Sequence, residues 1–207
     1  SMGPDALRIA GIARALQGLG LQVQDLGNLG GPGNPQSAPS GGFRHLAEVT
    51  AWNQAVFAAT LSALQAGRLP LLMGGDHCLA IGSISAVAHH CRAHARRLKV
   101  LWFDAHADAN TPASSPSGNL HGMPVACLLG HGPAQLMQLA GTGAALQAEQ
   151  IVDVALPVEN RPGASGADFL ATMVEQYRGR DDQVSVTSLS MMINQIRGVS
   201  AYGYTDV

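Results

Sequence analysis

The sequence predicts an α/β protein in which helices flank a mostly parallel β-sheet. Segments with apolar residues at helical spacing alternate with short, uninterrupted apolar runs. Two of these runs, at residues 69–73 and 99–103, have the pattern of strands that are buried on both faces, as in parallel sheets. The chain has 207 residues, of which 46% are hydrophobic, so we expect one folded domain with a single substantial core.

The N-terminal third predicts a helix, a short strand and a long loop. Ile9, Ile12, Leu16 and Leu19 are spaced by three and four residues, which predicts an amphipathic helix over residues 5–19. Polar and apolar residues alternate at 21–24, a pattern typical of a strand. Residues 27–42 are rich in glycine and proline and predict a loop.

Two helix–strand pairs follow this loop. Helical spacing of apolar residues begins at Val49 and ends at Gly67, and the first buried strand follows at residues 69–73. A third helix is predicted over residues 79–97, with basic residues near its end, where they suit the helix macrodipole. The second buried strand, at residues 99–103, comes directly after it.

Charge and cysteine content exclude several classes of protein. The chain has 12 Lys and Arg against 14 Asp and Glu, a formal net charge of −2, which argues against a nucleic-acid or anionic-membrane partner. No apolar run approaches the length of about 18 residues that a membrane span needs. The first residues lack the features of a signal peptide, and the 3 cysteines fit neither a disulfide framework nor a zinc knuckle. We therefore expect a soluble, cytoplasmic protein.

Polar side chains that could bind a metal follow both predicted strands. His77 comes after the first strand, and Asp104, His106 and Asp108 come after the second at intervals of two. An extended backbone would turn these three alternate side chains to one side, at the sheet edge where ligands bind. Two carboxylates and imidazoles so close together need a cation, and this donor set suits Mn²⁺, with Fe²⁺, Co²⁺ or Zn²⁺ as competitors. Any one of these residues alone would be explained as a cap or a surface group.

Three segments of the chain carry a family resemblance. Residues 74–83, 104–111 and 117–124 resemble, in order and in spacing, the motifs of the arginases of the ureohydrolase superfamily. The resemblance runs from about residue 3 to residue 150, and the segment at 117–122 favours arginase over agmatinase-like relatives. It implies a three-layer arginase-like fold with a mostly parallel sheet flanked by helices, and we expect the fold to be incomplete here.

The resemblance also implies a metal centre and a reaction. In the family, two Mn²⁺ ions per subunit are expected, one held by His77 and Asp108, the other by His106, with Asp104 bridging both. A hydroxide between the ions, hydrogen-bonded to Asp108, would attack the guanidinium carbon of L-arginine and yield L-ornithine and urea. The family forms homo-oligomers, commonly trimers or hexamers.

Further residues receive roles from the same resemblance. His121 matches the proton shuttle, although taken alone it would be a residue that precedes a helix starting at Pro124. Asn110, Ser117 and Asn119 match the loop that recognises the α-carboxylate of the substrate, and Ser115 would assist through water.

The chain departs from the family pattern after residue 150. No second carboxylate pair of the Asp-x-Asp type occurs there, so two of the family's metal ligands are missing and one ion or none is possible. We divide the chain into an arginase-like core at 1–150 and a divergent or truncated segment at 151–207. Impaired arginine hydrolysis is the leading hypothesis. The alternatives are a non-catalytic protein that binds metal or associates with other subunits, and a hydrolase for agmatine or another guanidino compound.

Overall fold

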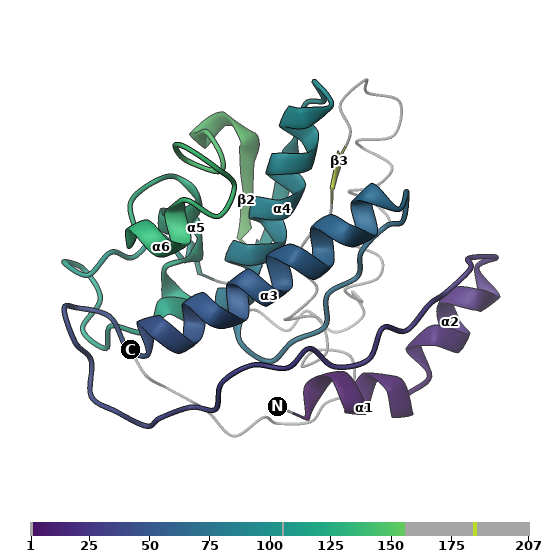
Figure 1. Ribbon diagram of the computed structural model, residues 1–207, viewed down its shortest axis with the longest axis horizontal. Helices are drawn as coiled ribbons and strands as arrows, with labels where there is room; N and C mark the ends of the chain where they lie inside the picture. Colours follow the sequence, from purple (N-terminus) through teal and green to yellow (C-terminus); the bar gives the residue numbers. More distant parts are fainter. Residues whose placement is uncertain (1, 105, 156–183, 186–207) are drawn as a thin grey trace.

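The computed structural model describes residues 2–104, 106–155 and 184–185, and these ranges contain several helices and a small three-stranded sheet (Figure 1). The longest helix, α3 (Leu46–Gln65), runs across α4 (Ala80–Ala93). The described residues also form three strands: β1 (Lys99–Asp104), β2 (Ile151–Ala155) and β3 (Val184–Ser185). The shorter elements are α1 (Gly3–Ile9), α2 (Ile12–Gly18), α5 (Pro124–Leu128), α6 (Ala134–Met137) and the 3₁₀ turns η1 (His77–Leu79), η2 (Leu120–Gly122) and η3 (Ala148–Gln150).

The described strands form a parallel sheet with the order β2-β1-β3. β1 pairs with β2 along its length, with Val100 opposite Ile151 and Asp104 opposite Ala155. β3 pairs with the start of β1, where Lys99 lies opposite Val184. This arrangement confirms the predicted parallel sheet and places the carboxyl end of β1, at Asp104, at one edge.

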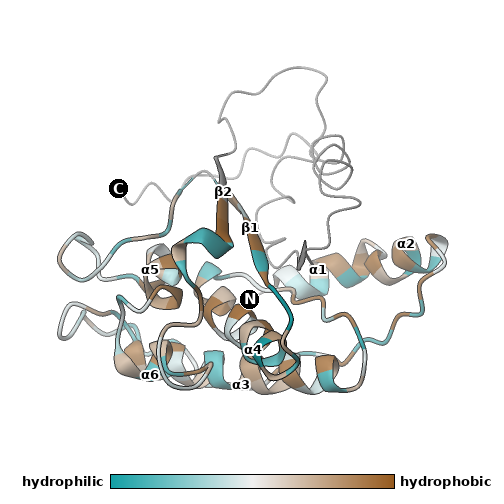
Figure 2. Cartoon of the chain, turned by 90° about the horizontal axis from the view of Figure 1, so that it is seen from above, coloured by the Kyte–Doolittle hydropathy of each residue, from teal (hydrophilic) through white to brown (hydrophobic). Residues whose placement is uncertain are grey.

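The main hydrophobic core lies between β1 and α4. Val100 and Trp102 project from β1 toward Ile84 and Val87 of α4, and Leu128 of α5 closes the same cluster. Leu101 and Phe103, on the opposite face of the strand, are also buried, which confirms the prediction of a strand buried on both faces. Figure 2 shows α3, α4 and α6 gathered on one side of β1 and β2.

A close backbone approach joins α3 to α4. Asn53 of α3 is fully buried, and its side-chain oxygen accepts a hydrogen bond of 2.6 Å from the backbone N–H of Gly82. The side-chain amide of Asn53 donates to the Val49 carbonyl one turn earlier. Only glycine fits at position 82, because a Cβ there would lie 2.4 Å from the Asn53 carbonyl oxygen. This contact fixes the position of the first turn of α4, which directly follows η1.

The N-terminal helix differs from the prediction. The expected helix over residues 5–19 is divided into α1 and α2, because Gly11 adopts a left-handed conformation with φ of 85°. Neither helix has a buried residue, and Ile9 and Leu19 of the predicted apolar stripe are largely exposed. Polar contacts support the segment instead, since the Arg8 guanidinium donates to Asp25 at 2.7 Å.

Two predicted strands are not strands in the structure. Residues 69–73 have no regular structure, and Leu69 and Leu71 are 89% and 44% exposed. Residues 21–24 are likewise irregular, whereas the loop at 27–42 is confirmed as largely irregular chain. The physical reason is that an apolar run becomes a strand only beside a partner, and no described strand pairs with either segment.

Among the described residues, no helix combines the length and the apolar character that crossing a membrane requires. Cys78, Cys91 and Cys127 are free thiols and all three are buried. The divergent segment at 151–207 lies outside the described residues except for β2 and β3.

Candidate metal centre

The turn η1 positions the first candidate ligand. The carboxylate of Asp76 caps this turn by accepting a 2.9 Å hydrogen bond from the backbone N–H of Cys78. Cys78 is buried in a second hydrophobic cluster with Leu120 and Met123, as expected for a packed small residue. Burial and the nearby Asp76 carboxylate raise the pKa of the Cys78 thiol far above its usual value. Because Asp76 and Cys78 are both held in place, the His77 between them is positioned beside the carboxyl end of β1.

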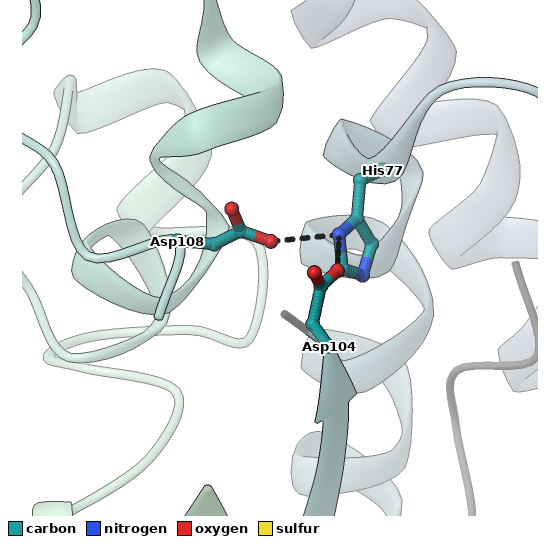
Figure 3. Close-up of side chains that lie close together, drawn as sticks. All are labelled: His77, Asp104 and Asp108. Atoms are coloured by element: carbon teal, nitrogen blue, oxygen red, sulfur yellow. Dashed lines mark ion pairs between the residues drawn. The ribbon is translucent and has the colours of Figure 1, made fainter. Parts of the chain in front are cut away.

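Three of the predicted ligands converge at the carboxyl end of β1 (Figure 3). His77 Nδ1 lies 2.9 Å from Asp104 Oδ2 and 2.7 Å from Asp108 Oδ2. Asp104 is only 1% exposed, and Asp108 is also buried. One ligand atom from each residue lies within 4.8 Å of the other two. This is the one group of three or more potential ligands found among the described residues.

The electrostatics of this group are those of a cation site. Burial alone would lower the pKa of His77, but the close contacts of its ring with the Asp104 and Asp108 carboxylates, together with their charges, raise that pKa to about 9. Burial likewise opposes ionisation of Asp104, yet the His77 ring and the His106 backbone N–H lower the pKa of this carboxyl. Without a metal, a proton on His77 therefore supplies the positive charge between two buried carboxylates.

The donor set fits a small divalent metal. Bonds of about 2.0–2.2 Å to oxygen or nitrogen would separate opposite ligand atoms by up to about 4.4 Å. His77 Nδ1 lies 2.9 Å from Asp104 Oδ2 and 2.7 Å from Asp108 Oδ2, within this span. Two carboxylates with one imidazole suit Mn²⁺ and its first-row neighbours, and the group contains no thiolate.

His106 lies on the other side of the same carboxylate. Its Nδ1 is 3.1 Å from Asp104 Oδ1, and its backbone N–H donates to that oxygen at 3.0 Å. The side chain is 75% exposed and does not join the compact group. Asp104 thus directs one oxygen toward His77 and the other toward His106, which is the arrangement that a bridging carboxylate requires.

The route by which Asp108 reaches the site differs from the prediction. The spacing predicts an extended backbone from Asp104 to Asp108, but β1 ends at Asp104 and Asp108 is left-handed, with φ of 48°. Its carbonyl accepts a 3.0 Å hydrogen bond from the Val125 N–H of α5, which holds this conformation. Such backbone strain at a non-glycine residue typically occurs at functional sites.

The predicted substrate loop is built from short side-chain contacts. Asn110 accepts a hydrogen bond from the Ser114 hydroxyl, and its backbone N–H donates to the Gly122 carbonyl. The hydroxyls of Ser115 and Ser117 accept hydrogen bonds from the backbone N–H groups of Gly118 and Asn119, respectively. Asn110 is exposed and Asn119 half-buried, so the loop offers amide groups at the surface next to η2.

His121 lies in η2, directly before α5, which begins at Pro124. This placement agrees with the simpler sequence interpretation of a residue that precedes a helix. The turns η1 and η2 nevertheless pack against each other, so His121 belongs to the element that adjoins His77. Its ring is exposed and lies outside the three-residue group, and its role as a proton shuttle stays a prediction.

Two residues that support the site are not among those that the sequence predicts for it. Asp76 precedes a turn in the way an N-cap does, a signal that the sequence contains. Trp102 is stacked on the His77 ring, with centroids 4.5 Å apart and an angle of 18° between the planes. The only sequence signal for this contact is that Trp102 and Asp104 are two residues apart on one strand.

Comparison with known proteins agrees with this geometry. A profile of the arginase family matches residues 1–160. Arginase from Bacillus caldovelox is 40% identical over 153 residues, which are 73% of this chain and 50% of that protein. Arginase from Bacillus subtilis is 37% identical over 152 residues, 73% of this chain and 49% of that protein. The chain therefore spans about half the length of these curated relatives.

Solved structures give the same result. A solved structure of arginase from Bacillus caldovelox superposes with a TM-score of 0.69 at 33% identity, and the match covers 89% of this chain and 58% of that one. A crystal structure of arginase from Bacillus subtilis gives a TM-score of 0.66 at 36% identity, with 73% and 49% coverage. Together with the profile match over most of its length, these similarities show that the chain belongs to the arginase family.

Proposed function

We propose that this chain carries part of an arginase centre, which hydrolyses the guanidinium group of L-arginine to L-ornithine and urea with Mn²⁺. The observation that carries the proposal is the convergence of His77, Asp104 and Asp108 in a chain of the arginase family. A divalent metal at this position would activate water as a nucleophile at neutral pH. The residues of the chain then have to hold the metal, orient the substrate and move protons.

Asp104 would be the central ligand of the site. The His77 ring and the His106 backbone N–H keep this buried carboxyl ionised by lowering its pKa, and its two oxygens point toward the two histidines. His77 and Asp108 would complete the ligands of the first metal, and His106 would be a ligand of the second. Before metal binds, the proton on His77 has to leave, so we expect metal affinity to rise with pH.

The segment from Asn110 to His121 would handle the substrate. Amide groups of Asn110 and Asn119, with the hydroxyls of Ser115 and Ser117, are suitable donors for an α-carboxylate. His121, exposed on η2 beside η1, would transfer a proton to the leaving amine. These roles follow the family motif at each position and are supported by the tethering of the loop to the metal-site elements.

The absence of a second Asp-x-Asp pair after residue 150 weakens the second metal position. Only His106 and the shared Asp104 would hold that ion, and we expect arginine hydrolysis by this polypeptide to be reduced or absent. This favours a second candidate function, that of an arginase-like protein that binds one metal without turnover or associates with other subunits.

Urea release separates these functions. The protein is loaded with Mn²⁺, and urea production is measured with L-arginine and, separately, with agmatine. Preferential hydrolysis of arginine supports the proposed activity, and faster hydrolysis of agmatine assigns a different substrate. No urea from either compound, although metal is bound, supports the non-catalytic function. The matched control is His121→Asn, which leaves the ligand set intact.

A further inference from the structure

Trp102 contacts the candidate metal centre without offering a ligand. It belongs to β1, two residues before Asp104, and is 1% exposed. Its indole stacks almost parallel on the imidazole of His77, which comes from η1. Because alternate residues of a strand share a face, β1 presents both an aromatic surface and a carboxylate to one imidazole.

These contacts restrict the imidazole in complementary directions. The indole plane fixes the plane of the His77 ring, with an interplanar angle of 18°. At the edge of the ring, Asp104 Oδ2 and Asp108 Oδ2 lie at 2.9 Å and 2.7 Å from Nδ1. A ring that was free to rotate about its Cβ–Cγ bond would lose this alignment. The stacking contact therefore preserves the direction in which Nδ1 points.

Tryptophan at this position destabilises the fold in one respect, through its buried N–H. The indole Nε1–H is buried and finds no hydrogen-bond partner among the described residues. A buried donor without a partner costs about 1–3 kcal/mol, and tryptophan is usually found where its N–H reaches an acceptor. Phenylalanine would fill a core without this penalty. The indole is thus explained by its broad flat face against His77 rather than by core packing alone.

We propose that Trp102 is a positioning residue, whose stacked indole holds the His77 imidazole in the orientation that binds the metal. The inference rests on the proposed metal site and adds to it a residue that touches neither metal nor substrate. Residues that orient metal ligands typically change metal affinity by 10–100-fold when they are replaced. Replacing Trp102 should therefore lower the affinity for metal, separately from any change in the free energy of unfolding.

The first experiment measures Mn²⁺ binding by electron paramagnetic resonance, using the full chain. We expect Trp102→Leu to weaken binding by 10-fold or more, and Trp102→Phe to restore only part of the affinity, because its ring offers His77 a smaller face. The control is Val100→Ala, which truncates a buried residue in the same cluster and strand and should lower stability without changing Mn²⁺ affinity. If Trp102→Leu binds Mn²⁺ as tightly as the parent chain, the inference is wrong.

A second experiment does not depend on the folding of Trp102→Leu. The chain has 2 tryptophans, Trp52 and Trp102, and Trp52→Phe leaves Trp102 as the sole emitter. Paramagnetic Mn²⁺ bound at His77 should quench this emission with the dissociation constant found by resonance. Binding without quenching would overturn the proposed stacking. If the parent chain binds no Mn²⁺, the proposed function itself fails. If the parent chain binds Mn²⁺ and Trp102→Leu binds it as tightly, only the role of Trp102 fails.

Discussion

Gly82→Ala tests whether the close approach of α3 and α4 supports the metal site. The added Cβ would lie 2.4 Å from the Asn53 carbonyl oxygen and 3.0 Å from its side-chain oxygen. Ordinary non-bonded carbon contacts are about 3.5 Å, so the two helices must move apart by roughly 1 Å. The nearer atom belongs to the backbone of α3, and rotation of a side chain cannot relieve the clash.

The magnitude follows from two destabilising contributions and one stabilising contribution. Overpacking of a core costs about 1–3 kcal/mol, and weakening the buried Gly82–Asn53 hydrogen bond adds about 1 kcal/mol. Replacing glycine by alanine within a helix stabilises the helix by about 1 kcal/mol. We therefore expect the free energy of unfolding to fall by about 1–3 kcal/mol. Since α4 follows η1 directly, Mn²⁺ affinity should also decrease.

Urea denaturation followed by far-UV circular dichroism measures the loss of stability. Gly18→Ala is the matched control, because this glycine lies in α2 with nothing within 4 Å of an added Cβ. The control should leave stability unchanged or raise it slightly. If Gly82→Ala is as stable as the parent chain, the close approach of the two helices is not a feature of the folded protein.

Three more changes test the site. Asp104→Asn removes the carboxylate charge between His77 and His106 and should weaken Mn²⁺ binding by at least about 100-fold in a resonance titration; unchanged affinity would exclude Asp104 as a ligand. In metal-free protein the raised pKa of His77, about 9, means that its stabilising contribution is complete below its ordinary pKa and is lost as pH rises through 9. Urea unfolding at pH 6 and pH 10 should show this loss, and His77→Gln should not. If the chain has activity, His121→Asn should lower urea release by about 10²–10⁴-fold with Mn²⁺ affinity unchanged, whereas a loss of affinity would contradict a proton-transfer role.

The elements that pack into the core could be predicted from the sequence. Helix α3, helix α4 and strand β1 have strong local patterns, and each is present in the structure within a few residues of its expected bounds. Residues 69–73 have an equally strong strand pattern but are irregular. The difference is tertiary, since β1 has strand neighbours on both sides, and local pattern alone does not reveal whether a partner strand exists.

The convergence of three candidate ligands could be predicted, but not how the chain assembles them. Residue types and spacing predict that His77, Asp104 and Asp108 lie together, and they also include His106, whose side chain lies outside this group. The left-handed turn at Asp108 depends on a hydrogen bond to Val125 of α5, which no local pattern encodes. The stacking of Trp102 on His77 depends on the relative placement of β1 and η1, so it too becomes visible only in three dimensions.

The stoichiometry of Mn²⁺ tests the central claim most directly. Elemental analysis of the chain after loading and removal of free metal should give one ion per chain, and the Asp104→Asn variant should retain none. That result would show that His77, Asp104 and Asp108 form a metal site and that the chain holds the first half of an arginase centre. Equal metal content in the two proteins, or no retained metal in either, would contradict this account.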